Sequence, residues 1–274
     1  MVSQEYTLRD LNPVQRAFSK QAKHYDDDDT QNHVLQDMRQ QVYHHASFFI
    51  KDGCPILELN AGTGIDALYF VKNGHSVLAT DASCGMVSEI EKKINRHQFQ
   101  DRFTCRQLAY DQLGQLTGEK FDFVFSNFGG LNCIDDLSKV TKDLSSILAP
   151  GAYITWVIMP PVCLWELLWF FKGYGKRAFR RFRKNGVIAH LEGEYFTTHY
   201  HSLSQIKKAF GPEFRLIKSE GLCALSPPPS RGDFPTRHPR LYKFLRGVDL
   251  AVRSRFPFNR CADHLIVTFQ FRSL

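Results

Sequence analysis

The stretch ILELNAGTGIDA, residues 56–67, decides the fold, because an apolar strand-like run enters a glycine-rich turn that leads into a helix. Gly62 and Gly64 carry no Cβ, so the backbone can turn sharply while a ligand comes close. Asn60 stands where such a turn commonly has glycine, and asparagine is the non-glycine residue that best tolerates positive φ. We therefore expect the turn to survive the asparagine. Together with Ala67, the two glycines also fit a dinucleotide fingerprint, so the turn alone does not select the ligand.

Strand-like and helical patterns alternate from residue 54 onward. The predicted strands cover residues 55–60, 75–81, 102–108, 121–127 and 152–159, and the predicted helices begin near Gly64, Cys84, Asp111 and Asp135. Such alternation predicts an α/β fold with a doubly wound, mostly parallel sheet. The last two strands, 214–225 and 263–271, lack a regular crossover helix between them, which predicts an antiparallel closing pair. We expect a Rossmann-like sheet of seven strands with an antiparallel last strand.

The segments outside the predicted sheet differ in charge. Residues 1–50 are mostly helical in pattern and predict an N-terminal cap, followed by one domain over residues 51–274. Two insertions in that domain, at about 160–200 and 226–262, are basic. Residues 172–184 alone carry seven lysines and arginines and no acid, which equals the net charge of +7 of the whole chain. Residues 226–264 add eight lysines and arginines against three aspartates, so the rest of the chain is net acidic.

The cysteines and the apolar segments of the chain indicate in which cellular compartment we expect the protein. The seven cysteines are odd in number and scattered, which predicts reduced thiols in a cytoplasmic protein. The first residues lack the pattern of a secretory signal. The apolar run at residues 153–171 is split by Pro160 and Pro161 into pieces too short to span a bilayer. We expect a buried strand followed by a separate apolar helix.

Two carboxylates flank the glycine turn. Asp81 closes the second predicted strand and can accept hydrogen bonds from ribose hydroxyls, which NAD and S-adenosylmethionine both present. Glu58 precedes the turn by two residues; it would repel a pyrophosphate and attract the ammonium group of an amino acid. A long helical segment before the first strand and the Pro-Gly turn in LAPGAYI, residues 148–154, point the same way. These features favour S-adenosylmethionine over NAD.

The order of these segments resembles the sequential motifs of the class I S-adenosylmethionine-dependent methyltransferases. The resemblance covers about residues 54–159 and rests on ILELNAGTG, VLATDASCGMV, LAYDQL, FDFVFSNFGGLNCIDD and LSSILAPGAYI. AFSKQAKHYDDD, residues 17–28, resembles the N-terminal helix of the branch that modifies quinones, lipids and small molecules. The resemblance implies a methyltransferase with S-adenosylmethionine as cofactor. An NAD-dependent oxidoreductase, an RNA methyltransferase and a non-catalytic binding module remain as alternatives.

The resemblance also implies roles for individual residues around the cofactor. They are Glu58, Asn60, Ala61, Gly62 and Gly64 at the methionine end, Asp81 at the ribose, Ala82 and Met86 at the adenine, Ala109, Tyr110 and Asp111 near the adenine amino group, Asn127 and Phe128 beneath the sulfonium, and Tyr25 as a cap. Some of them have purely structural alternatives. Met86 and Phe128 could be core residues, Tyr25 an ordinary buried tyrosine, and Asp111 a helix cap.

Candidates for acceptor chemistry lie in EYFTTHYHSLSQ, residues 194–205. A hydroxyl acceptor is helped by a general base, worth roughly 10²–10⁴ in rate. We predict His201 first and His199 second for this role, with Tyr195 and Tyr200 as pocket walls; a hydrogen-bonded structural histidine is the alternative. No metal site is predicted, because these histidines and His190 lack a nearby carboxylate or cysteine.

The first insertion pairs an apolar stretch with a basic one. This composition fits a lid over a hydrophobic acceptor, and equally an interfacial segment on anionic lipid; a solvated face is the alternative. SNFG, residues 126–129, differs from the Asn/Asp-Pro-Pro-aromatic motif of amino-methylating DNA enzymes, and nucleic acid is not predicted. We expect a small acceptor that is hydrophobic and either lipid-like or anionic. Oxygen is the preferred target atom for methylation, and carbon or nitrogen comes next. The sequence makes no prediction of oligomeric state.

Overall fold

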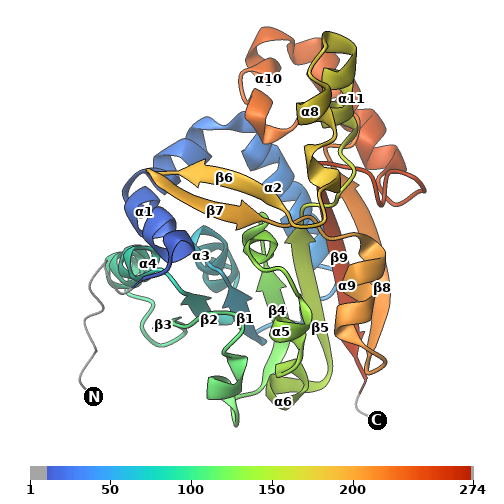
Figure 1. Cartoon of the computed structure of the whole chain (residues 1–274). Helices are drawn as coiled ribbons and strands as arrows, with labels where there is room; N and C mark the ends of the chain where they lie inside the picture. Colours follow the sequence, from blue (N-terminus) through green and yellow to red (C-terminus); the bar gives the residue numbers. More distant parts are fainter. Residues whose placement is uncertain (1–10, 273–274) are drawn as a thin grey trace.

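The computed structural model describes residues 11–272. Seven strands form one sheet in the order β3-β2-β1-β4-β5-β9-β8 (Figure 1). The strands are β1 (Pro55–Leu59), β2 (Ser76–Asp81), β3 (Phe103–Gln107), β4 (Phe121–Ser126), β5 (Leu148–Ile158), β8 (Phe214–Leu222) and β9 (His264–Phe271). β9 runs antiparallel to both of its neighbours, and β1 to β5 pair in parallel. The predicted fold class, including the antiparallel last strand, is confirmed.

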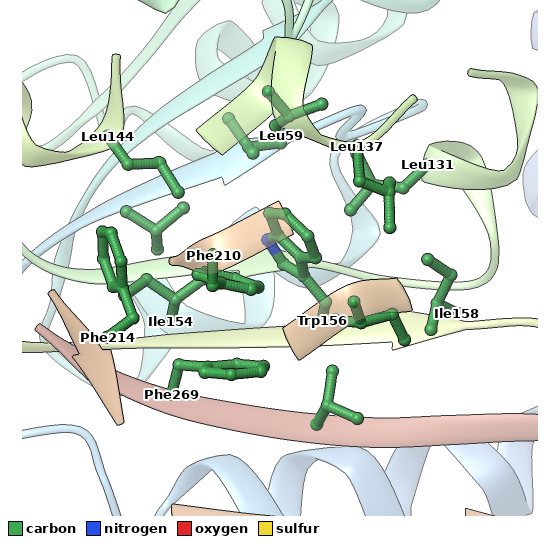
Figure 2. Close-up of a cluster of buried hydrophobic side chains, with 14 of the residues drawn as sticks. Leu59, Leu131, Leu137, Leu144, Ile154, Trp156, Ile158, Phe210, Phe214 and Phe269 are labelled. Atoms are coloured by element: carbon green, nitrogen blue, oxygen red, sulfur yellow. The ribbon is translucent and has the colours of Figure 1, made fainter. Parts of the chain in front are cut away.

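Helices cover both faces of the sheet, because alternate strand residues are apolar on both sides. One core lies beneath α2 (His33–Ala46), α3 (Ile65–Lys72) and α4 (Cys84–His97). The other core lies beneath α5 (Ser138–Thr141), α6 (Leu144–Ile147) and α9 (Leu203–Phe210). In this second core Trp156 of β5 lies 4.4 Å from Phe210 between ring centroids, and Phe210 stacks on Phe269 at 3.9 Å (Figure 2).

Two helices precede the sheet, as the pattern of residues 10–50 predicts. α1 (Pro13–Gln31) begins at a capping box in which the Asn12 side chain accepts from Gln15 N–H, and Pro13 occupies the first turn. Asn32 ends α1 and caps α2 by accepting from Leu35 N–H at 3.1 Å. The chain therefore bends at Asn32 and places α1 apart from the sheet, over the carboxyl ends of its strands (Figure 1).

The helix predictions after β3 and β4 are wrong in extent. The segment at Asp111 contains only a 3₁₀ turn, η1 (Leu113–Leu116), because Gly114 and Gly118 interrupt it and few residues separate β3 from β4. The segment at Asp135 forms two single turns, α5 and α6, in place of one helix. Its apolar residues are nevertheless buried at helical spacing: Leu137, Val140, Leu144 and Ile147.

Apart from the helical turns that follow Pro160 and Pro161, the sequence patterns do not predict the elements of the two insertions. The first holds α7 (Leu164–Leu167), η3 (Leu168–Lys172), α8 (Gly175–Ala178), η4 (Arg180–Phe182) and a hairpin of β6 (Val187–Leu191) and β7 (Glu194–Thr198). The second holds η5 (Pro229–Arg231), α10 (Phe234–Arg237) and the 14-residue α11 (Pro239–Val252). No regular crossover helix is evident in the sequence pattern between the last two strands, where α11 lies; the antiparallel pairing of β8 and β9 is as predicted. α11 carries apolar residues on its exposed side, such as Phe244, which obscures the helical period.

The apolar run at residues 153–171 divides as predicted. β5 ends at Ile158, and the short helical turns α7 and η3 follow the two prolines. Among residues 11–272, no helix has the length and apolar character needed to cross a membrane.

Candidate functional site

A cavity of about 430 Å³ opens at the carboxyl ends of the parallel strands. In an open α/β sheet this edge is the usual place for a ligand. Its wall comes from the loops after β1, β2, β3, β4 and β5, and from α1 and β7. It includes eleven of the fourteen predicted cofactor residues: Tyr25, Asn60, Gly62, Asp81, Ala82, Met86, Ala109, Tyr110, Asp111, Asn127 and Phe128.

Asn60 takes the backbone conformation that a glycine would supply in the first turn. Its φ is 45°, and those of Gly62 and Gly64 are 57° and 78°. The Asn60 side chain also joins two loops: Oδ1 accepts from Ser126 Oγ at 2.8 Å, and Nδ2 donates to the Asn127 carbonyl at 3.3 Å. A Cβ on Gly130 would lie 2.3 Å from Asn60 Nδ2. The asparagine therefore fits because its neighbour is a glycine.

Asp81 lies at the end of β2 with both carboxylate oxygens directed at backbone N–H groups. Oδ2 accepts from Gly62 N–H at 2.9 Å and Oδ1 from Ser83 N–H at 2.8 Å. Burial raises the pKa of Asp81 to about 6, although these backbone bonds, and one from Ala82, oppose the shift. Each oxygen keeps a second lone pair for a hydroxyl donor. Asp81 therefore holds the glycine turn and can accept from a ribose.

Three of the predicted residues lie outside the lining of the main cavity. Gly64 begins α3, where a Cβ would lie 3.0 Å from Ile90. Ala61 lines a small adjoining cavity of about 20 Å³ together with Arg39 and Asp66. Glu58 is buried, and its Oε2 has no hydrogen-bond partner. Burial raises the pKa of Glu58 well above its usual range, and Asp66 adds to the shift while Arg39 opposes it.

A buried ionic network beneath the turn was missed in the sequence. Arg39 of α2 forms ion pairs with Asp29 of α1 and Asp66 of α3. Asp66 also accepts from Tyr43 Oη at 2.6 Å and from Asn127 Nδ2 at 3.0 Å. The Arg39 guanidinium lies 4.7 Å from the centroid of the Phe128 ring. This network joins three helices to the loop after β4, so it sets the position of two predicted site residues, Asn127 and Phe128.

The β6–β7 hairpin holds α1 over the cavity. Glu194 at the start of β7 forms ion pairs with Arg16 at 3.0 Å and Lys20 at 2.8 Å. These pairs lower the pKa of Glu194 to about 2, the Arg16 hydrogen bond being the largest cause. The hairpin turn has positive φ at both Glu192 and Gly193, as a two-residue turn requires. The Glu-Gly pair between alternating runs was the sequence signal for this hairpin.

Further cavity residues come from segments that the motif analysis did not assign. α1 contributes Phe18, β7 contributes Phe196, and the end of β5 contributes Met159. Asn132 is fully buried and fixes this wall: its Oδ1 accepts from Met159 N–H at 2.8 Å, and its Nδ2 donates to the His199 carbonyl at 2.6 Å. Asn132 lies within the motif FDFVFSNFGGLNCIDD, but its role depends on partners far away in sequence.

Neither predicted catalytic histidine lines the cavity. His201 is buried, and its Nε2 lies 3.0 Å from the Ile134 carbonyl, to which it donates. Burial lowers the pKa of His201, so the ring is neutral. The backbone of His199 pairs with Asn132. Tyr195, a predicted pocket wall, is exposed, and Tyr200 packs against Arg181. The catalytic assignment stays a prediction that the geometry of the cavity does not support.

One cluster within residues 11–272 has metal-ligand types close together: Cys163, Glu166 and Asp263. Arg181 occupies the position that a cation would need, since its guanidinium pairs with Glu166 at 2.8 Å and with Asp263 at 2.7 Å. His264 and, after it, Arg181 hold the pKa of Asp263 well below its usual range against its burial. The cluster is thus an ionic contact between the first insertion and β9.

The residues at the glycine turn fit S-adenosylmethionine. The unpartnered Oε2 of Glu58 can receive an ammonium group, directly or through water, without giving up an existing bond. The open lone pairs of Asp81 suit ribose hydroxyls. Tyr25 lines both cavities and lies 4.0 Å from a Cβ built on Gly62, so glycine leaves the space above the turn free.

Comparison with known proteins agrees with this assignment. Residues 56–151 match a family model described as a methyltransferase domain. No curated protein sequence matches the chain.

Solved structures share the fold at low sequence identity. A SAM-dependent methyltransferase from Methanosarcina mazei is 14% identical, with a TM-score of 0.57 over 83% of this chain and 97% of that one. A 1,6-didemethyltoxoflavin-N1-methyltransferase from Burkholderia thailandensis, solved with 1,6-didemethyltoxoflavin and S-adenosylhomocysteine, is 15% identical, with a TM-score of 0.55 over 95% and 88%. The [4+2]-cyclase SpnF is 12% identical, with a TM-score of 0.57 over 86% and 81%.

Proposed function

We propose that this chain, a class I S-adenosylmethionine-dependent methyltransferase by its methyltransferase domain and its fold, methylates a small hydrophobic acceptor, with oxygen as the first target atom. S-adenosylmethionine supplies an activated methyl group, so the chain's own task is to align the acceptor and exclude water. In this proposal Asp81 binds the ribose, Glu58 receives the ammonium group, and Asn127 and Phe128 bound the reacting end of the cofactor.

The observation that carries the acceptor class is the composition of the cavity wall. Phe18, Phe196, Met159 and Ile134 contribute apolar surface from four different segments. The whole cavity, which the cofactor residues also line, measures about 430 Å³ and lies in the range of small-molecule sites; where these four apolar side chains form the wall, a hydrophobic ligand is favoured. The fold is shared with the Burkholderia enzyme, which was solved with 1,6-didemethyltoxoflavin, and this supports a small-molecule acceptor. Lipid-like, quinone-like and polyketide-like acceptors all satisfy this description.

The helical cap and the insertions are proposed to complete the acceptor side. Residues 1–50 act as the cap, and the insertions in residues 51–274 act as a lid. The support for this division is the contact of Glu194 with Arg16 and Lys20, because it joins the first insertion to α1 across the cavity. We place the protein in the cytoplasm, since all seven cysteines are free thiols.

Turnover by the purified full-length chain tests the reaction. The chain is incubated with methyl-labelled S-adenosylmethionine and phenols, hydroxyquinones, hydroxylated fatty acids, amines or RNA, and labelled product is measured. Methylation of a hydrophobic hydroxyl compound is the expected result, and methylation of RNA alone would contradict it. A thermal-shift comparison separates the oxidoreductase alternative, for which NAD would stabilise the chain more than S-adenosylmethionine does.

Substitution of Glu58 tests the methionine end of the site. Glu58→Gln keeps the shape of the side chain but cannot ionise to pair with the ammonium group, so affinity for S-adenosylhomocysteine should fall about tenfold. Affinity for methylthioadenosine, which lacks the amino-acid end, should stay unchanged. Thermal stability should not fall, because the buried carboxyl has no partner at Oε2. Glu119→Gln, at an exposed ion pair with Arg106, is the matched control. Equal losses for both ligands would contradict the role of Glu58.

A further inference from the structure

Six large apolar side chains of the first insertion are exposed together. They are Leu168, Phe170, Phe171, Tyr174, Phe179 and Phe182, with exposed fractions from 48% to 84%. Four of the rings form one row: Phe171 contacts Phe170 at 5.8 Å between centroids, Phe170 contacts Phe179 at 5.7 Å, and Phe179 contacts Phe182 at 6.0 Å. Contiguous exposed apolar surface of this kind marks a site of interaction.

Basic side chains surround these rings. Lys172, Lys176, Arg177, Arg183 and Lys184 are exposed, and Arg231 of the second insertion joins them. Arg177 and Arg231 lie over the Trp169 ring at 4.1 and 5.6 Å, so the two insertions meet at this indole. Within residues 11–272 none of these six cations forms an ion pair with a carboxylate. We call the six apolar residues and the six cations the aromatic–basic patch.

The patch is fixed to the fold by the buried ionic cluster beneath it. Glu166 binds both Arg180 at 2.7 Å and Arg181 at 2.8 Å, and Arg181 continues to Asp263 next to β9. Trp165 Nε1 donates to the Leu225 carbonyl at 2.9 Å. The turns that carry the exposed rings are only three to five residues long and could not hold their shape alone. The chain therefore presents a fixed apolar surface to its surroundings.

We propose that the aromatic–basic patch docks on the surface of an anionic lipid bilayer. Aromatic side chains enter the headgroup region while lysine and arginine pair with acidic headgroups, which requires both residue classes on one surface. A second copy of the chain is disfavoured, because it would bring six unpaired cations against six others. RNA is disfavoured, because neighbouring rings meet edge to face, at 79° and 67°, so the edge of one ring covers part of the face of its neighbour on which a base would stack.

Docking places the cavity near the bilayer. The segment that carries the patch begins after Met159, at the end of β5, and leads into the separate β6–β7 hairpin, which holds Phe196 and Thr198; all three of these residues line the cavity. The inference does not depend on the reaction, because it rests on the patch alone. Combined with the proposed function, it identifies the bilayer as the source from which a hydrophobic acceptor reaches the site.

Vesicle sedimentation with the full-length chain tests the proposal. The chain should sediment with vesicles of phosphatidylcholine and phosphatidylserine, about tenfold or more above its binding to phosphatidylcholine alone, and salt should reduce the difference. The triple variant Phe170→Ser/Phe171→Ser/Phe179→Ser and the triple variant Lys172→Gln/Lys176→Gln/Arg183→Gln should each lose about tenfold or more of this binding. Affinity for S-adenosylhomocysteine should stay unchanged in both. Equal sedimentation with the two vesicle types would overturn the proposal.

Matched exposed positions serve as controls. Phe48→Ser, at a phenylalanine that is 64% exposed elsewhere, and Lys207→Gln/Lys208→Gln on α9 should bind as the unmodified chain does. If a triple variant fails to fold, Phe171→Ser alone, at the most exposed ring, gives the same comparison. Loss of binding in the controls equal to that in the patch variants would overturn the proposal. Patch-dependent self-association or RNA binding without vesicle binding would overturn it too.

Discussion

Replacing Asp81 by alanine is expected to weaken binding of S-adenosylhomocysteine about 100-fold. Hydrogen bonds to a charged acceptor contribute roughly 1.5–3 kcal/mol each, and the variant loses the acceptor for the ribose hydroxyls. It also frees the Gly62 and Ser83 N–H groups, which the carboxylate holds at 2.9 and 2.8 Å. Isothermal titration of the purified chain measures the change. Glu119→Ala, at an exposed carboxylate outside the cavity lining, should change affinity by less than about threefold.

The pH dependence of binding identifies the same group. The pKa of Asp81 is raised to about 6, so the carboxylate is ionised at neutral pH and takes up a proton as the pH falls through 6. A protonated carboxyl has lost an acceptor position, so affinity should decrease between pH 7 and pH 5. Asp81→Asn should bind weakly and show a much flatter profile. An unchanged affinity in Asp81→Ala, or the same pH profile in Asp81→Asn, would contradict the assignment.

Replacing Arg39 by leucine is expected to lower the free energy of unfolding by about 3–5 kcal/mol at neutral pH. Arg39 is buried between Asp29 and Asp66, which are buried too. Removing one partner of a buried ion pair leaves uncompensated charge in a low-dielectric environment. The Asn127–Asp66 hydrogen bond and the Phe128 ring lose their support as well, so cofactor affinity should fall. Urea denaturation at several pH values measures the loss.

The pH dependence of the stability lost in Arg39→Leu separates an electrostatic effect from a loss of packing. Arg39 is a charge that lowers the pKa of Glu58, so its removal raises that pKa further. A carboxyl with a raised pKa in the folded chain binds its proton more tightly there than in the unfolded chain. The deficit of Arg39→Leu should therefore be largest at pH 7–8 and shrink as the pH falls. Arg106→Leu, which breaks an exposed pair with Glu119, should cost about 1 kcal/mol or less. A pH-independent deficit would show that packing dominates.

The predicted and observed sites differ where side chains depend on distant partners. The alternation of His199 and His201 in one segment predicts that both face the acceptor. In the structure Asn132 Nδ2 instead donates to the His199 carbonyl, and His201 donates to the Ile134 carbonyl. Both partners lie more than 60 residues away in the sequence. The Arg39 network joins α1, α2 and α3, and no local pattern marks it. The length of α11 is not evident in the sequence for a related reason, since its exposed apolar side chains hide its period.

The sequence by itself determined the order of the seven strands of the sheet, the glycine turn with Asn60 at positive φ, and the carboxylate at the end of β2. These features follow from the hydrophobic period of each segment and from backbone chemistry within a few residues. Only the tertiary structure decided which side chains face the cavity, how the Arg39 network holds Asn127 and Phe128, and that the exposed rings form one patch. Those outcomes depend on burial and on contacts between segments that are far apart in the sequence, so no single segment determines the free energy of such contacts.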